Sequence, residues 1–149
     1  MSGSVELTEI ERMVIEHACS RLLVGFTNAL DEHDPDQLLA MWEENCVWES
    51  PFGRAVGKPA VRQLLSSVAP ILERHLISNI IVSATDRNHA TGSARLTYYR
   101  ASSEVEGEVA QMQGATLLAD HFDRYVRTAQ GWRFAQRKTV FVLRLLPLP

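Results

Sequence analysis

Asp31 is the first residue whose type and position suit proton-transfer chemistry. Asp34 and Pro35 form a helix-start signal, because an aspartate caps free amides and a proline suits the first helical position. The preceding helix must therefore end near Asp31, where the helix dipole disfavours negative charge. A partly buried carboxylate at such a place is a candidate general base. The alternative is an exposed acidic turn, and this stretch alone supports both interpretations equally.

A second set of polar side chains falls on one phase of a long predicted strand, 109–127. Successive side chains of a strand point to opposite faces, so His121, Asp123 and Arg127 share a face. Polar groups on a central strand need hydrogen-bond partners or a wet cavity. A binding pocket accounts for them, and so does an oligomer interface with polar pairs. Arg137, on the last predicted strand, is expected to be a structural ion-pair partner.

Other catalytic arrangements find no support in the residue spacing. The five histidines are scattered, without the paired helical spacing of a zinc site. There is no nucleophile elbow, phosphate loop or dinucleotide fingerprint. Cys19 and Cys46 lack metal-ligand spacing and are too few for a disulfide framework. We therefore expect neither a metal nor a cofactor.

Length, composition and charge limit the class of protein. The chain has 149 residues, which predicts a single domain over 1–149. Hydrophobic residues at 46% and charged residues at 22% are typical of a soluble globular protein. The formal net charge of -3 gives no reason to expect nucleic acid or an anionic membrane as a partner. Two buried, reduced cysteines and the absence of a signal peptide or a membrane span predict a cytoplasmic protein.

Helical periodicity dominates the first half of the chain and strand patterns the second. Helices are predicted over 9–32, 35–43 and 59–72, and strands over 46–50, 75–84, 90–100, 109–127 and 132–145. Helices followed by antiparallel strands are typical of an α+β fold. Three helices packed into one curved sheet would form a cone with an internal pocket.

Two elements carry predictions about which side is buried. The apolar stripe of the first helix is predicted at Ile10, Met13, Val14, His17, Leu23, Phe26 and Leu30. In the strand 75–84, alternation puts His75, Ile77, Asn79 and Ile81 on one face. Both faces of this strand are largely apolar, which predicts that helices cover one and a second subunit covers the other.

The ordered set of these segments resembles the SnoaL-like branch of the nuclear transport factor 2-like superfamily. The resemblance extends over nearly the whole chain, and the residues that carry it are Leu30-Asp31, Trp42, Cys46-Val47-Trp48, Gly57 to Val61, Arg74 to Asn79, Tyr125-Val126-Arg127 and Gly131 to Phe134. It implies a cone-shaped α+β barrel, with three N-terminal helices packed in a strongly curved, mostly antiparallel sheet.

Within this superfamily the chain is most similar to the scytalone dehydratase, dehydrochlorinase and bile-acid dehydratase type, which are cofactor-free lyases. The resemblance implies that Asp31 and His75 form a catalytic pair, in which the imidazole removes a proton from carbon while hydroxide or chloride leaves. It further implies substrate-binding roles for Trp48, Asn79, Tyr98, His121 and Arg127. Leu30 stands where scytalone dehydratase has a tyrosine, so the sequence departs from that substrate type.

Together these features predict a cofactor-independent lyase (a dehydratase or related elimination) or isomerase, acting on a small hydrophobic molecule as a homodimer or homotrimer. The alternatives are a non-catalytic ligand-binding protein and the small (beta) subunit of a ring-hydroxylating dioxygenase, which has the same fold. Binding without conversion would favour the former. Co-purification of a larger iron-sulfur subunit would favour the latter.

Overall fold

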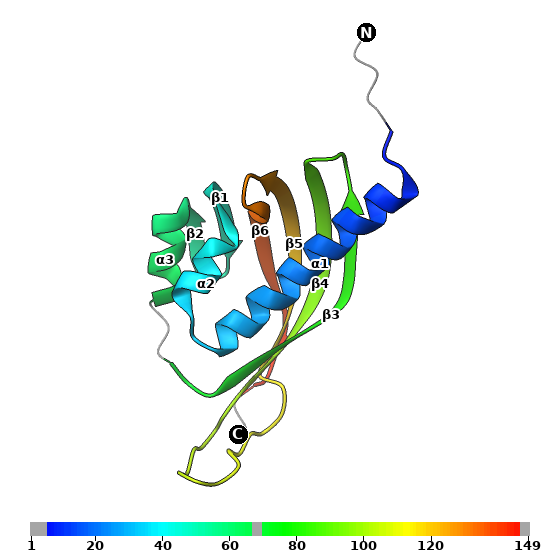
Figure 1. The fold of residues 1–149 in the computed structure, drawn as a ribbon. Coiled ribbons are helices and arrows are strands. Elements are labelled where there is room, and N and C mark those ends of the chain that lie inside the picture. Colours follow the sequence, from blue (N-terminus) through cyan, green and yellow to red (C-terminus); the bar gives the residue numbers. More distant parts are fainter. Residues whose placement is uncertain (1–5, 67–69, 147–149) are drawn as a thin grey trace.

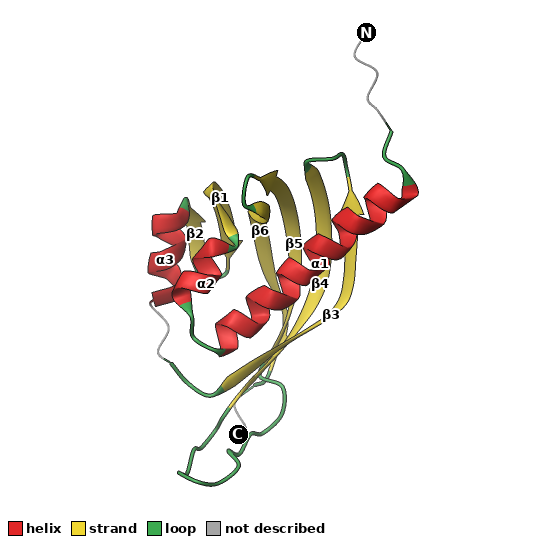
Figure 2. Ribbon diagram, in the orientation of Figure 1, coloured by secondary structure: helices red, strands yellow, loops and turns green. Residues whose placement is uncertain are grey.

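The computed structural model describes residues 6–66 and 70–146, and its helices lie against one face of a six-stranded, curved sheet (Figures 1 and 2). The helices are α1 (Glu9–Asp31), α2 (Pro35–Ala40) and α3 (Lys58–Ser66). The strands are β1 (Trp42–Ser50), β2 (Gly53–Val56), β3 (Glu73–Ala84), β4 (His89–Arg100), β5 (Leu117–Thr128) and β6 (Gly131–Arg144). The prediction of an α+β fold is confirmed.

The sheet has the order β2-β1-β6-β5-β4-β3. Neighbouring strands are antiparallel except for β1 and β6, which pair in parallel with Trp42 opposite Phe134. The sheet does not close, so β2 and β3 are its two edges. The long helix α1 crosses the sheet, while α2 and α3 cover the end formed by β1 and β2 (Figure 1).

Local signals in the sequence set both ends of α1. Thr8 and Glu11 form a capping box, in which each side chain accepts a hydrogen bond from the other residue's backbone N–H. At the other end, Asp34 accepts a hydrogen bond from the backbone N–H of Gln37 at 3.0 Å and starts α2. Asp31 is consequently the last residue of α1, as predicted.

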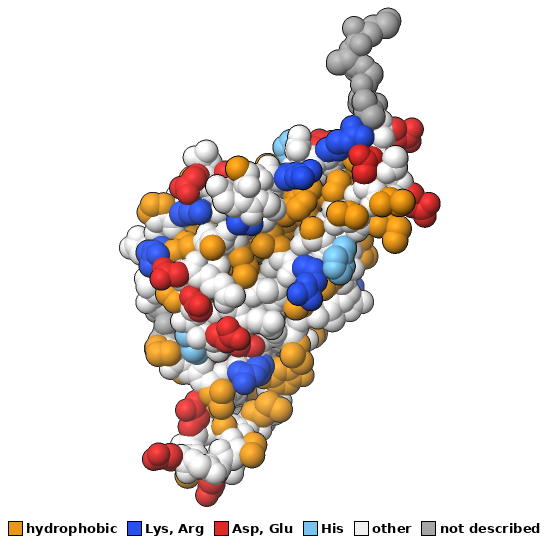
Figure 3. All heavy atoms as spheres, in the orientation of Figure 1, with side chains coloured by type: hydrophobic (Ala, Val, Ile, Leu, Met, Phe, Trp, Pro, Cys, Tyr) orange, Lys and Arg blue, Asp and Glu red, His pale blue; other side chains and the backbone are white. Residues whose placement is uncertain are grey.

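The predicted apolar stripe of α1 is wrong in its first three turns. Ile10 and Met13 are 74% and 62% exposed, whereas Ile15 and Cys19 are buried together with Leu23. Apolar residues occur on both sides of the helix in these turns, so residue type alone did not identify the buried side. Hydrophobic side chains accordingly gather on the surface over the start of α1 (Figure 3).

A β-bulge at Asn79 makes the predicted face of β3 wrong for the residues that follow it. Asn79 has a φ of 49°, and the pairing of β3 with β4 shifts register around it. One extra residue in a strand reverses the alternation beyond it. Ile77 and Ile80 therefore both pack against the core, while Ile81 is 64% exposed.

Three boundaries also differ from the prediction. The strand predicted over 109–127 begins only at Leu117, and Gly114 lies in the loop 101–116 that precedes it. The third predicted helix is described only as far as Ser66, residues 67–69 lie outside the described part, and residues 70–72 are not helical. Pro70 lacks the backbone N–H that a continuing helix would use for its hydrogen bond, so the helix does not extend through this residue. The short strand β2 was not predicted.

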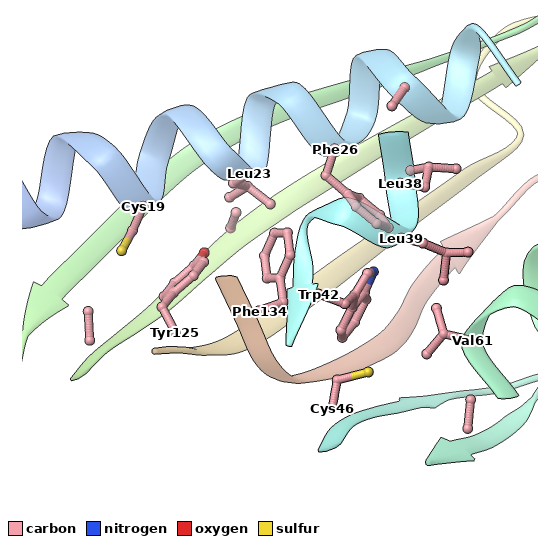
Figure 4. Close-up of a cluster of buried hydrophobic side chains, with 14 of the residues drawn as sticks. Cys19, Leu23, Phe26, Leu38, Leu39, Trp42, Cys46, Val61, Tyr125 and Phe134 are labelled. Atoms are coloured by element: carbon pink, nitrogen blue, oxygen red, sulfur yellow. The ribbon is translucent and has the colours of Figure 1, made fainter. Parts of the chain in front are cut away.

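The largest buried side chains are aromatic and lie where α1 meets β1 and β6. The ring of Phe26 packs edge-on against Trp42 and Phe134, with centroids 5.9 and 5.4 Å away, and Tyr125 continues the cluster (Figure 4). This packing anchors the C-terminal half of α1 and thereby places Asp31, about one and a half turns beyond Phe26, against β3. None of the described helices is long and apolar enough to cross a bilayer.

Candidate functional site

Asp31 and His75 form a hydrogen-bonded pair between the end of α1 and the start of β3. The Asp31 Oδ1 atom lies 2.7 Å from the His75 Nδ1 atom. The backbone N–H of His75 donates to both oxygens of the same carboxylate, at 3.0 and 3.1 Å. An ionised carboxylate only accepts hydrogen bonds, so Nδ1 carries the proton and the Nε2 of a neutral imidazole carries the lone pair. The pair is thus arranged as a base with its orienting carboxylate.

Tyr98 forms a wall beside this imidazole. It pairs with His75 across the β3–β4 ladder, and the two ring centroids are 4.8 Å apart. Its hydroxyl donates to Glu73 Oε2 at 2.6 Å, and burial together with this carboxylate raises the pKa of Tyr98. The hydroxyl is therefore protonated and already bonded. Glu73, which is buried, was missed in the sequence analysis, although it precedes His75 by two residues and so shares its face.

His121 lies on the inner face of β5 and is 5% exposed. Its Nδ1 atom is 3.1 Å from the Thr139 hydroxyl, which also accepts a hydrogen bond from the Trp48 indole N–H at 3.1 Å. Burial lowers the pKa of His121 to about 2, and the positive charge of Arg137, with that of His75 when it is protonated, acts in the same direction. His121 is therefore a neutral hydrogen-bonding group at ordinary pH.

Trp48 connects this polar group to the aromatic core. Its ring stacks on Trp42 with centroids 5.5 Å apart and meets Phe26 edge-on at 5.9 Å. Its indole N–H points to Thr139. The structure thus brings three of the predicted binding residues, Trp48, Tyr98 and His121, to the inner side of the sheet with the Asp31–His75 pair.

Arg127 and Asn79 are two predicted binding residues that the structure does not bring together with that pair. Arg127 is exposed near the end of β5, ten residues along the strand from Leu117, which lies beside Tyr98. At about 3.3 Å per residue it is roughly 30 Å from the pair. Asn79 is exposed at the β3 bulge and lines a depression with Arg95, Asp120 and His121. The resemblance did not reveal the bulge.

Asp123 and Arg137 form a second ion pair, in the interior. Arg137 donates from Nε and Nη2 to the two Asp123 oxygens at 2.8 and 2.9 Å, and the Tyr125 hydroxyl adds a third hydrogen bond at 3.0 Å. The guanidinium carbon lies 4.6 Å from the Phe26 ring centroid and 4.4 Å from that of Phe134. The ion-pair role predicted for Arg137 is confirmed, and the cross-strand register supplies its partner. No group of three or more His, Cys, Asp or Glu side chains within residues 6–66 and 70–146 could hold a metal ion.

Several solved structures are similar to this one. A candidate scytalone dehydratase from Novosphingobium aromaticivorans is 19% identical with a TM-score of 0.77, and the match covers 91% of this chain and 89% of that one. A type 2 hexachlorocyclohexane dehydrochlorinase is 16% identical with a TM-score of 0.75, covering 95% of both chains. The beta subunit of a candidate aromatic-ring-hydroxylating dioxygenase from Novosphingobium aromaticivorans is 13% identical with a TM-score of 0.71, covering 90% and 94%. At these identities the likeness shows the fold.

The sequence itself decides the family. No curated protein matches the chain. The model of the SnoaL-like domain matches residues 11–138. This range includes the Asp31–His75 pair and all six strands, apart from residues 139–144 at the end of β6. The resemblance stated from the sequence is confirmed at this level: the chain belongs to the SnoaL-like domain family.

Proposed function

We propose that the protein is a cofactor-independent lyase, a dehydratase or related elimination enzyme, or an isomerase, acting on a small hydrophobic molecule. The observation that carries the proposal is the Asp31–His75 contact of 2.7 Å, in a carboxylate that is also held by the His75 backbone N–H. These contacts fix the ring and leave its Nε2 lone pair free to act. Side-chain exposures of 14% for His75 and 13% for Asp31 indicate a partly enclosed pair that a ligand can still approach.

The geometry supports a proton transfer from carbon. His75 Nε2 takes the proton, and Asp31 stabilises the resulting imidazolium through its Nδ1–H bond. The electron pair of the broken C–H bond forms a carbon–carbon double bond, while the leaving group departs with the electrons of its own bond. Hydroxide accepts the proton from His75 and leaves as water, whereas chloride leaves as the anion and the proton passes to solvent. In an isomerase, His75 would return the proton to a different carbon.

The surroundings favour an uncharged substrate. The Tyr98 ring lies against the imidazole, and neither Tyr98 nor His121 carries a charge at ordinary pH. Proton abstraction from carbon in a site of this kind uses the low local dielectric, which strengthens the attraction between Asp31 and the imidazolium. Cys19 and Cys46 are buried, and burial raises their pKa values to about 12 and about 11, so neither supplies a nucleophile.

A subunit role is the second candidate function, and the outer face of the sheet favours it. Leu76, Phe122 and Val142 are each at least half exposed there. A second copy of the chain, in a homodimer or homotrimer of cytoplasmic single-domain subunits, would cover this face and is compatible with the lyase. A larger dioxygenase subunit would cover it too, and the dioxygenase beta subunit shares the fold. The mass of the purified protein by light scattering, and any larger chain that co-purifies, separate these outcomes.

Deuterium wash-in tests the proposed chemistry without knowledge of the leaving group. The protein would be incubated in D₂O with a panel of small hydrophobic molecules, each carrying an acidic C–H next to a carbon that bears hydroxyl or chloride. We expect the wild type to exchange the C–H of at least one of them or to convert it into the unsaturated product, both of which NMR of the same samples detects. His75→Gln and Asp31→Asn should each slow that reaction by about 10²–10⁴-fold, the usual contribution of general base catalysis.

His17→Gln is the matched control, because His17 is an exposed histidine at the opposite half of α1. It should exchange like the wild type. Equal exchange in His75→Gln and wild type would refute the role of His75. Tight binding of a panel member with neither exchange nor product formation by the wild type would favour the non-catalytic ligand-binding protein.

A further inference from the structure

We propose that His121 donates a hydrogen bond from Nε2–H to an oxygen atom of the bound molecule, and that Thr139 and Trp48 are positioning residues that fix this tautomer. The tautomer is a property of the free protein. Only the identity of the bound molecule as a small neutral substrate rests on the proposed function.

Three neighbouring strands of the sheet bring these residues together. His121 on β5 and Thr139 on β6 are direct cross-strand partners, so their side chains lie on the same face. Trp48 comes from β1, which pairs with β6 on its other side. The chain of contacts runs from Trp48 Nε1 to Thr139 Oγ1 at 3.1 Å and from Thr139 Oγ1 to His121 Nδ1 at 3.1 Å.

The direction of these hydrogen bonds follows from the number of donors. An indole N–H can only donate, so Trp48 occupies one lone pair of the Thr139 oxygen. If His121 Nδ1 also donated, the Thr139 hydroxyl hydrogen would have no acceptor among the described residues, although Thr139 is only 8% exposed. If Nδ1 is unprotonated, the hydroxyl donates to it and both Thr139 contacts are satisfied. The remaining group is the His121 Nε2–H, and Nε2 is not among the fully buried, unpartnered side-chain atoms of the described residues. Buried polar groups are almost always satisfied, so the proton of His121 is on Nε2.

The Nε2–H group is left without a protein partner. The structure gives the His121 ring one hydrogen bond, at Nδ1, and shows no acceptor for Nε2 within residues 6–66 and 70–146. The positive charge of Arg137 disfavours a protonated His121, and the N–H of a neutral imidazole can only donate. The complementary ligand atom is therefore a hydrogen-bond acceptor such as an oxygen.

The two imidazoles on the inner face of the sheet have opposite hydrogen-bonding character. His75 presents a lone pair at Nε2, whereas His121 presents an N–H. A donor on a carbonyl oxygen stabilises the negative charge that develops there when a base removes a proton from the adjacent carbon. The proposal thus narrows the substrate class to molecules with a carbonyl, or a comparable oxygen, beside the carbon that loses its proton.

Nitrogen NMR of the ¹⁵N-histidine-labelled, full-length protein tests the tautomer. We expect His121, assigned by its loss in His121→Gln, to be the Nε2–H form throughout about pH 5 to pH 8. Thr139→Val removes the hydroxyl and should abolish the single fixed tautomer, whereas Thr139→Ser keeps the hydroxyl and should retain it. An Nδ1–H signal in the wild type, or an unchanged tautomer in Thr139→Val, would overturn the positioning role.

Cyclohexanone and methylenecyclohexane, two neutral rings that differ in the oxygen acceptor, test the ligand contact. The ketone should shift the His121 Nε2–H resonance downfield, and the hydrocarbon should not. In Thr139→Val the ketone should bind about two- to tenfold more weakly, because only the fraction of His121 in the Nε2–H form can donate to it. No shift with the ketone up to its solubility limit would refute the contact. Because His75→Gln should still show the shift, this outcome is independent of whether the proposed catalysis exists.

Discussion

The protein contains two carboxylate pairs of nearly equal geometry and very different surroundings. Asp31 meets His75 at 2.7 Å, and Asp123 meets Arg137 at 2.8 and 2.9 Å. Each carboxylate has a further donor, the His75 backbone N–H in one case and the Tyr125 hydroxyl in the other. The side chains of the first pair are 13% and 14% exposed, whereas those of the second are 1% and 0% exposed.

The difference teaches that a short contact does not by itself indicate chemistry. The guanidinium of Arg137 is flanked by Phe26 and Phe134 and cannot give up its proton in a protein. A neutral imidazole, by contrast, can accept a proton, and the Nε2 atom of His75 has no hydrogen-bond partner among the described residues. The first pair is therefore suited to proton transfer, and the second to holding β5 and β6 under α1.

Breaking the buried pair should have the largest effect on stability. Arg137→Met leaves the Asp123 charge in the interior without its counter-ion, which typically costs about 3–5 kcal/mol in unfolding free energy. Urea denaturation would measure it. The double variant Asp123→Leu/Arg137→Met removes both charges and should recover part of the loss. A single-variant cost below about 1 kcal/mol would show that this region is not the structural pair inferred here.

The pH dependence of the unfolding free energy tests whether His121, on the inner face of the sheet, is neutral in the folded protein. Its pKa is about 2 in the folded protein, lowered first by burial and then by the charge of Arg137, against about 6.5 in an unfolded chain. Below the unfolded value the unfolded state binds the additional proton, so His121 destabilises the fold as the pH falls from about 6.5. Between about pH 7 and pH 5 the wild type should lose about 2 kcal/mol more than His121→Gln. Parallel pH curves for the two proteins would contradict a neutral His121.

His75→Gln should have the smallest effect on stability, about 1 kcal/mol or less, although it abolishes the proposed base. The reason is that Asp31 keeps the hydrogen bond from the backbone N–H of residue 75 and stays partly hydrated. The same urea experiment measures it. A loss of unfolding free energy as large as that of Arg137→Met would show that the Asp31–His75 pair has a structural role like that of Asp123 and Arg137.

Local signals in the sequence were sufficient for the fold class and for one end of the candidate site. Asp34 and Pro35 end α1 at Asp31 because capping is decided within a few residues. The resemblance then associated Asp31 with His75, and the structure joins them. The helix-start signal lies within one short segment, and the resemblance rests on the order of segments along the chain, so neither depends on the pairing of distant strands.

Features that depend on pairing between distant strands could not be predicted. The bulge at Asn79 interrupts the alternation of β3, and the register of β4 with β5 places Leu117, at the opposite end of β5 from Arg127, beside Tyr98. The Trp48–Thr139–His121 contacts require the register of three strands at once. Strand alternation gives the phase of each strand alone, and a single inserted residue reverses it.

The parallel pairing of β1 with β6 makes the order of synthesis matter for this protein. Trp48 emerges from the ribosome 91 positions before Thr139, the residue that accepts its hydrogen bond. Until β6 appears, β1 has no partner for that edge and the apolar side of α1 has only part of its sheet. Contacts so distant in the chain slow folding, and exposed apolar strands favour association. A nascent chain stalled before β6 should therefore stay sensitive to proteases, and folding should be completed only after release.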